Sequence, residues 1–171
     1  MATTYEAIAT VTVGSGGAAN IEFTSIPATY TDLVLLTSTR VTASGGSADG
    51  EYATINFNST GALADSRLLY GDGAAAGGLT KTDGEYAYVI DTNNTANTFN
   101  NDMIYIPNYA GSNKKSFSVD NAQESNGSGA YVMLWASLWD NTSAITSIKL
   151  NAPTGTFQQY STATLYGIKN S

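Results

Sequence analysis

The side chains most able to do chemistry in this chain are its carboxylates, because the 171 residues include no His and no Cys. His is the commonest general base, and His and Cys together supply most zinc and copper sites. Three carboxylate pairs lie close in sequence: Asp49/Glu51, Asp83/Glu85 and Asp65/Asp72. Such pairs perform glycoside hydrolysis, but these lie beside glycine-rich turns, where solvated carboxylates are expected. The sequence therefore predicts no catalytic residue and a protein that is not an enzyme.

Acidic side chains in loops are also candidate ligands for Ca²⁺, which prefers oxygen donors. Asp72, Asp83 and Asp91 are the loop candidates, but no segment matches the EF-hand pattern. The segment 77–82 (GGLTKT) has the glycines and the lysine of a phosphate-binding loop without its spacing, and it is predicted to be a flexible turn. We expect no metal site and no cofactor, with a structural calcium ion as the open alternative.

Two tryptophans, Trp135 and Trp139, lie four residues apart and form a candidate platform for stacking on sugar rings. Large aromatic side chains dominate protein cores, so core packing is favoured over ligand binding. Trp135 is predicted to be a core residue. Trp139 precedes Asp140-Asn141 and is predicted to lie at the rim of the domain.

The charge of the chain excludes several partners. Seven Lys and Arg stand against 14 Asp and Glu, for a net charge of −7, and binding to a phosphate backbone needs an excess of cations. No nucleic acid is expected. The first residues lack the basic and apolar parts of a signal peptide, and no apolar run approaches the roughly 20 residues that span a bilayer. We expect synthesis in a cytoplasm, no export by the usual route and no membrane contact.

The elements that position these side chains are predicted to be strands. Residues 5–13 (YEAIATVTV) alternate with a period of two and, with 20–23, indicate a hairpin. Residues 129–138 are the most hydrophobic segment and are predicted to form a central strand, whereas 71–78 (GDGAAAGG) is predicted to be a mobile surface loop. We count about ten strands at spacings near a dozen residues, without a helical period or an internal repeat. The pattern predicts one all-β domain over 1–171, an antiparallel sandwich, barrel or jelly roll.

Five phrases, in order across nearly the whole chain, carry a resemblance to a known family: the start YEAIAT at 5–10, IPATYTDLVLL at 26–36, IPNY at 106–109 followed by Lys114-Lys115, WDNTSAITSI at 139–148 and STATLYGI at 161–168. Together they resemble small virion proteins of tailed phages, notably those of marine and cyanobacterial hosts. The chain departs from the family at 70–78 (YGDGAAAGG), where members often have Ser and Arg after the middle strand. The resemblance implies a jelly-roll-like sandwich, a structural place on the particle and no catalytic residues.

Three functional hypotheses follow, the first two from the resemblance and the third from the carboxylate pairs. The first is a capsid decoration (cement) protein on the outer surface of the virion, which binds the major capsid protein or another structural protein of the particle. Since shell sites lie on symmetry axes, such a protein is expected to form a symmetric homo-oligomer, for example a trimer. The second is a tail or fibre module that recognises host-surface glycans, and the third is a glycan-degrading enzyme.

Candidate interface residues follow from the first hypothesis. They are Tyr5, Ile8, Trp139 and Tyr166. The N-terminal segment 5–13 is expected to face the shell, and the 71–78 loop is expected to face solvent. Sequence alone leaves open the oligomeric number and the choice between head and tail.

Overall fold

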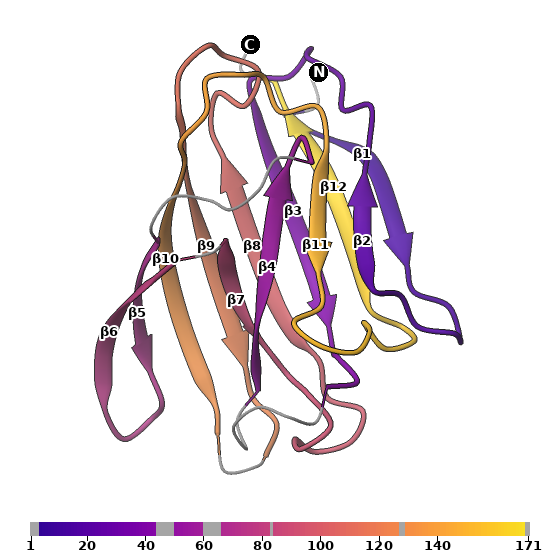
Figure 1. Ribbon diagram of the computed structural model, residues 1–171, viewed down its shortest axis with the longest axis vertical. Coiled ribbons are helices and arrows are strands. Elements are labelled where there is room, and N and C mark those ends of the chain that lie inside the picture. The colour runs from indigo at the N-terminus through magenta and orange to yellow at the C-terminus, as the bar shows by residue number, and fades with distance from the viewer. Residues whose placement is uncertain (1–3, 44–49, 60–65, 83, 127–128, 170–171) are drawn as a thin grey trace.

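The computed structural model describes residues 4–43, 50–59, 66–82, 84–126 and 129–169. These residues form twelve strands in two sheets and no helix, so none of them provides a helix that could cross a membrane (Figure 1). The strands are β1 (Tyr5–Thr12), β2 (Asn20–Phe23), β3 (Asp32–Thr39), β4 (Glu51–Phe57), β5 (Ser66–Gly71), β6 (Ala76–Lys81), β7 (Glu85–Val89), β8 (Asn100–Ile106), β9 (Lys115–Gln123), β10 (Tyr131–Trp139), β11 (Ile148–Asn151) and β12 (Thr162–Ile168). The all-β antiparallel sandwich is confirmed, with two strands more than expected.

Eight of the strands form a jelly roll. Counting inward from the two ends, β1 pairs with β12, β2 with β11, β3 with β8 and β4 with β7, all antiparallel. These pairs alternate between the sheets, so one sheet contains β1-β12-β3-β8 and the other β2-β11-β4-β7. A long antiparallel ribbon wrapped in this way into two layers is the jelly-roll arrangement.

Four further strands extend one layer only. The hairpin β5–β6 follows β4, and the hairpin β9–β10 follows β8; together they lengthen the first sheet to the order β1-β12-β3-β8-β9-β10-β5-β6. Figure 1 shows these strands at the left, where the larger sheet extends beyond the four-stranded sheet in front of it. The sandwich is therefore asymmetric, with eight strands in one sheet and four in the other.

The core lies between the sheets and follows from the alternation of side chains along each strand. On β10, Met133 and Trp135 are buried while Leu134 between them is exposed. The opposite layer contributes Ile55 and Leu150, which are fully buried. Trp135 is confirmed as a core residue.

Several of the sequence phrases that carry the family resemblance form the corners of this fold. The ring of Tyr30 lies so close to the backbone of Gly167 that a Cβ there would be 2.2 Å from a ring atom, which explains a glycine in the last strand. The Tyr109 hydroxyl donates to the carbonyl oxygen of Pro27, and Asp32 accepts from the Asn108 N–H. These contacts join the 26–36 corner to the turn after β8.

A buried cation joins two more of the phrases. Lys115 is 2% exposed, and its Nζ donates to the carbonyl oxygens of Gly111, Thr142 and Ser143 at 2.7, 3.2 and 2.5 Å. Burial lowers the pKa of this ammonium group. The same Nζ lies 5.5 Å from the ring centroid of Trp139. The lysine thus ties the β8–β9 turn to the segment after β10.

Two local predictions are wrong. Residues 5–23 are not a hairpin: β1 pairs with β12 and β2 with β11, and 14–19 carry the chain from one sheet to the other. Residues 71–78 are not one loop, and 77–82 is not a flexible turn, because β6 begins at Ala76 and runs to Lys81. Glycine fits this strand because a Cβ at Gly77 would meet the Tyr70 ring at 2.7 Å.

Candidate functional site

The candidate acidic residues lie only partly within the described part of the chain. One member of each carboxylate pair, Asp49, Asp65 or Asp83, lies outside the described residues. Glu85 forms an ion pair with Lys81 at 3.4 Å. Within the described ranges, no three His, Cys, Asp or Glu side chains are grouped so that they could hold a metal ion.

Asp91 has a structural place instead. It is fully buried, and its Oδ1 accepts from the Asn93 N–H at 2.8 Å. Nearby, Arg40 is 3% exposed and donates to the carbonyl oxygens of Asn94, Thr95 and Thr98 at 2.9–3.1 Å. Burial lowers the pKa of the Arg40 guanidinium, and the charge of Asp91 opposes that shift. Both ions fix the loop between β7 and β8.

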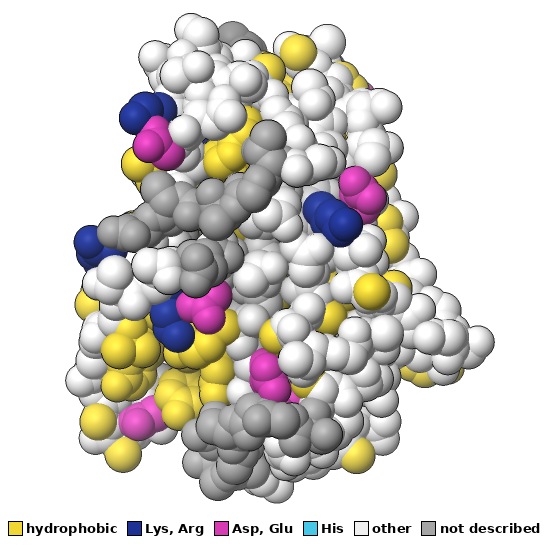
Figure 2. Space-filling view, viewed as in Figure 1, with side chains coloured by type: hydrophobic (Ala, Val, Ile, Leu, Met, Phe, Trp, Pro, Cys, Tyr) yellow, Lys and Arg dark blue, Asp and Glu magenta, His cyan; other side chains and the backbone are white. Residues whose placement is uncertain are grey.

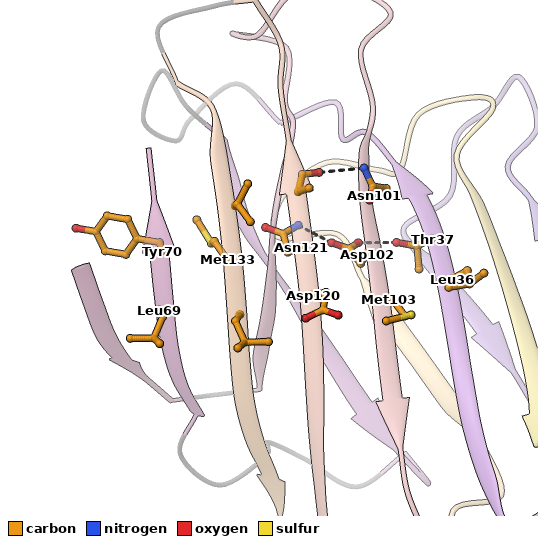
Figure 3. Close-up of a pocket in the computed structure, with 13 residues that line it drawn as sticks. Leu36, Thr37, Leu69, Tyr70, Asn101, Asp102, Met103, Asp120, Asn121 and Met133 are labelled. Atoms are coloured by element: carbon orange, nitrogen blue, oxygen red, sulfur yellow. Dashed lines mark hydrogen bonds between the residues drawn. The ribbon is translucent and has the colours of Figure 1, made fainter. Parts of the chain in front are cut away.

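The most unusual surface is the face of the eight-stranded sheet that points away from the four-stranded sheet, here called the outer face. The strand register places five residues in one row across β3, β8, β9, β10 and β5: Leu36, Met103, Asp120, Leu134 and Leu69. Figure 3 shows this face, with Leu36, Met103 and Asp120 on three neighbouring strands and Leu69 on the far side of β10. Four of these five side chains are apolar, at positions where a solvated sheet has polar residues.

The outer face is hollowed at this row. A depression of about 610 Å³ runs from Leu36 to Leu69 and includes Val132. The apolar side chains in it are well exposed, with Leu69 and Val132 at 65% and 69% and Leu36, Met103 and Leu134 between 42% and 51%. Tyr105 adds a further exposed ring on β8. A contiguous apolar patch of this kind marks an interaction site more often than a solvated surface.

The outer face carries very little charge. Among its outward-facing positions in the described strands, Asp120 and Arg67 are the exposed charged residues. Asp32, at the end of β3, is buried and accepts from the Tyr105 hydroxyl at 3.0 Å. No described Lys or Arg lies within ion-pair distance of Asp120. The apolar row therefore surrounds one carboxylate without a cation.

The outward surface of the four-stranded sheet has a different composition. Its register places Lys149 between Glu22 and Asn56. The Asn151 amide donates to Asn56 Oδ1 at 2.7 Å and to Thr54 Oγ1 at 3.2 Å. Polar groups on this face thus pair with one another across strands, as expected for a surface in water.

A buried polar group lies one residue away from the apolar row, on the inward side of β8. Asp102 is 3% exposed; it accepts from Thr37 Oγ1 at 2.5 Å, from Asn121 Nδ2 at 2.5 Å and from Asn100 Nδ2 at 3.0 and 3.1 Å. Figure 3 shows Thr37, Asp102 and Asn121 side by side on three strands. Burial raises the pKa of Asp102 to about 6, although these hydrogen bonds lower it. The fully buried Tyr86 has its pKa raised well above the ordinary value by burial and by the Asp102 charge.

The four predicted interface residues do not form one surface. Tyr5 is 53% exposed and meets Tyr166 edge-on, with 6.4 Å between ring centroids, at the β1–β12 end of the outer face. Ile8 is half-buried and packs against the core. The rim position expected for Trp139 is wrong: it is 2% exposed, because β10 continues unbroken to Trp139 and gives it the inward orientation of Trp135.

The apolar row was missed by sequence analysis, although a signal for it exists. Leu36 ends the apolar run 33–36, and Leu134 lies in the hydrophobic segment 129–138. The run 33–36 was interpreted as a strand buried on both faces, and 129–138 as a central strand. In the structure, Val34 on the outward side of β3 is buried, whereas Leu36 and Leu134 point outward and are exposed.

Comparisons with known proteins supply no relative. No protein-family model, no curated protein and no solved structure matches this chain. The resemblance to phage virion proteins therefore stays a prediction from sequence phrases. The geometry of the outer face is the strongest observation that bears on function.

Proposed function

We propose that this chain is a structural protein of a phage particle, a capsid decoration protein that docks on the outside of the head through its outer face. The observation that carries the proposal is the apolar row Leu36, Met103, Leu134 and Leu69 on a sheet face with two exposed charges. The jelly roll supports it, since viral capsid proteins commonly use this fold. The protein would be made in the host cytoplasm and reside on the virion surface.

The dimensions of the outer face suit a stable interface. Eight strands at a spacing of about 4.8 Å span about 34 Å, and six residues along a strand span about 20 Å. The footprint is therefore about 700 Å², close to the roughly 800 Å² that each partner buries in a specific complex. Such an interface favours an apolar centre with few charges, which is the composition of this face.

The proposed occupant is the shell protein, through an apolar surface that carries a Lys or Arg. A dry interface around Asp120 is favourable only when the carboxylate is paired, because an unpaired buried charge costs several kcal/mol. Packing of two outer faces against each other would bring together two copies of a chain with a net charge of −7, and the exposed cation that each face offers to the other's Asp120 is Arg67. A symmetric oligomer on a shell axis, such as a trimer, would therefore use other surfaces for contacts between its copies.

Quantitative proteomics of purified particles tests the location. We expect the chain in a copy number close to that of the shell protein. A copy number that matches the few subunits of a tail, or absence from the particle, would overturn the proposal.

Reconstitution on particles that lack the chain tests the docking surface. Leu134→Asp places a charge in the apolar row at an exposed position and is expected to abolish docking without loss of folding. Thr24→Asp adds the same charge at an exposed position next to β2 and is expected to dock normally. Equal docking of both variants would show that the outer face is not the interface.

The alternative from sequence, a module that recognises glycans, is favoured by a different region. This alternative is supported by a group of tyrosines on the inward side of the larger sheet, opposite the outer face. They lie between that sheet and the strands β4 and β7.

A further inference from the structure

A second hollow opens where the added strands extend past the four-stranded sheet. It measures about 210 Å³ and is lined by four tyrosines and three other residues: Tyr52, Tyr70, Tyr88, Tyr131, Asp72, Leu79 and Met133. Figure 2 shows apolar side chains gathered in this part of the molecule, at the lower left, beside a blue and magenta pair of charged residues. The hollow is smaller than the roughly 300–1,000 Å³ of a drug-sized pocket, so its occupant is a single small ring or group.

The four phenol rings contact one another in series and are tilted or edge-on, with interplanar angles of 50°, 89° and 67°. Ring centroids are 4.6 Å apart for Tyr52 and Tyr88, 5.6 Å for Tyr88 and Tyr131, and 6.1 Å for Tyr131 and Tyr70. Tyr88 is buried, whereas Tyr52, Tyr70 and Tyr131 are half-buried and reach the surface. Partly exposed aromatic rings offer flat apolar faces next to polar hydroxyl groups.

The charges at the rim argue against a cationic ligand. Lys81 Nζ lies 3.4 Å from the centroid of the Tyr52 ring, which is the position that a bound ammonium ion would take. Glu85 holds this lysine at 3.4 Å. The aromatic site for a cation is thus occupied by the protein's own side chain, and a second cation would be repelled by it.

The same rim supplies a hydrogen-bond acceptor. Asp72 is exposed, and its Oδ1 accepts from the N–H groups of Ala74 and Ala75 at 2.9 and 2.6 Å. These bonds lower the pKa of Asp72, so the carboxylate stays ionised. A fixed carboxylate beside aromatic rings is suited to ligands that carry several hydroxyl groups, because charged acceptors form the stronger hydrogen bonds.

We propose that this hollow binds one uncharged pyranose ring of a glycan. The apolar C–H face of the sugar would stack on one of the half-buried tyrosine rings, its hydroxyls would donate to Asp72, and Lys81 would donate to a sugar oxygen. Side chains alternate along a strand, so Leu69 and Leu134 face outward while Tyr70 and Met133 face this hollow. The sugar site therefore lies on the other side of the larger sheet from the proposed shell contact and does not depend on it.

Ligand-observed NMR with five monosaccharides, glucose, galactose, mannose, N-acetylglucosamine and N-acetylgalactosamine, tests the proposal on the full chain. Saturation transfer to at least one of them is expected, with a Kd of about 1 mM, the strength of a few contacts. Choline serves as the cationic probe and is expected not to bind. Absence of transfer to all five sugars, or binding of choline in their place, would overturn the proposal.

Variants identify the residues involved. Asp72→Asn and Tyr70→Ala are each expected to weaken sugar binding about tenfold or more, since each removes one charged hydrogen bond or one stacking face. Asp120→Asn and Tyr5→Ala make the same changes away from the hollow and are expected to bind normally. Equal binding by all four would show that the sugar sits elsewhere. Leu134→Asp, the variant expected to abolish shell docking, is expected to keep sugar binding. The docking proposal and the sugar proposal can therefore fail independently of each other.

Discussion

The two outward surfaces of this sandwich are made from the same kind of strand but carry opposite chemistry. On the four-stranded sheet, Lys149 lies opposite Glu22, and Asn151 bonds to Asn56. On the eight-stranded sheet, Leu36 and Leu134 occupy the equivalent outward positions. Cross-strand polar pairs stabilise a surface that stays in water, whereas exposed leucines gain free energy only when another surface covers them. The contrast is the one that the proposed docking through the outer face requires.

The largest expected loss of stability comes from a residue between the two surfaces. Trp139→Ala removes a buried ring that meets Phe57 at 5.5 Å between centroids and lies near Lys115. We expect the free energy of unfolding to fall by about 3–5 kcal/mol, measured by urea denaturation. Tyr5→Ala at an exposed position is expected to cost less than about 1 kcal/mol. Similar losses for the two variants would place Trp139 at the surface after all.

A change of pH is expected to have a smaller effect on the free energy of unfolding. The pKa of Asp102 is raised from 3.8 to about 6 in the folded protein, so the folded state binds a proton more tightly than the unfolded state. The resulting stabilisation is complete below pH 4 and is lost as the pH rises through about 6, by on the order of 2–3 kcal/mol.

Asp102→Asn isolates this contribution because it keeps the shape of the side chain and removes its titration. Neighbouring amides such as Asn121 can turn over to supply an acceptor for the new donor. We expect the difference in unfolding free energy between the variant and the natural chain to change between pH 4 and pH 7 in favour of the variant. A difference that stays constant over this range would contradict the raised pKa.

The smallest expected change in stability compares the two outward surfaces directly. Asn151→Ala removes the amide that bridges Asn56 and Thr54, and the expected loss is about 1 kcal/mol, the net value of a hydrogen bond. Leu134→Thr on the apolar face is expected to change stability by less than about 0.5 kcal/mol, because this side chain is half exposed. Thermal unfolding of both variants provides the comparison. A larger loss for the Leu134 variant would mean that the outer face stabilises the isolated chain.

The class of fold was predictable from local pattern, but the pairing of strands was not. Alternation at 5–13 correctly indicated a strand, yet its partner is β12, at the far end of the chain. A jelly roll pairs strands that are distant in sequence, and a local pattern holds no information about such partners. Strand β6 was missed for another reason: Gly77 and Gly78 disfavour a strand locally, whereas pairing with β5 and the Tyr70 ring above Gly77 stabilise one.

The candidate sites were less predictable than the fold. The tyrosines of the sugar site come from four different strands, and no spacing in the sequence links Tyr52 with Tyr131. Whether the Trp139 side chain points into the core depends on whether β10 includes it. The predicted strand ended one residue earlier, at 138, and so left the orientation of Trp139 undetermined. The expectation of no metal site stays a prediction, because Asp83 lies outside the described residues; the described Asp and Glu side chains form no group of three that could hold an ion.

The extra hairpins β5–β6 and β9–β10 have a consequence for how such a protein changes over time. The paired ribbon of eight strands closes the jelly roll, while Leu69, Leu134 and Asp120 all belong to the added strands. Tyr70 and Asp72, at the sugar site, lie in or next to the β5–β6 hairpin as well. Exchange of these two short segments would therefore alter both surfaces at once, while Leu36, Met103, Tyr52 and Tyr88 remain on strands of the jelly roll.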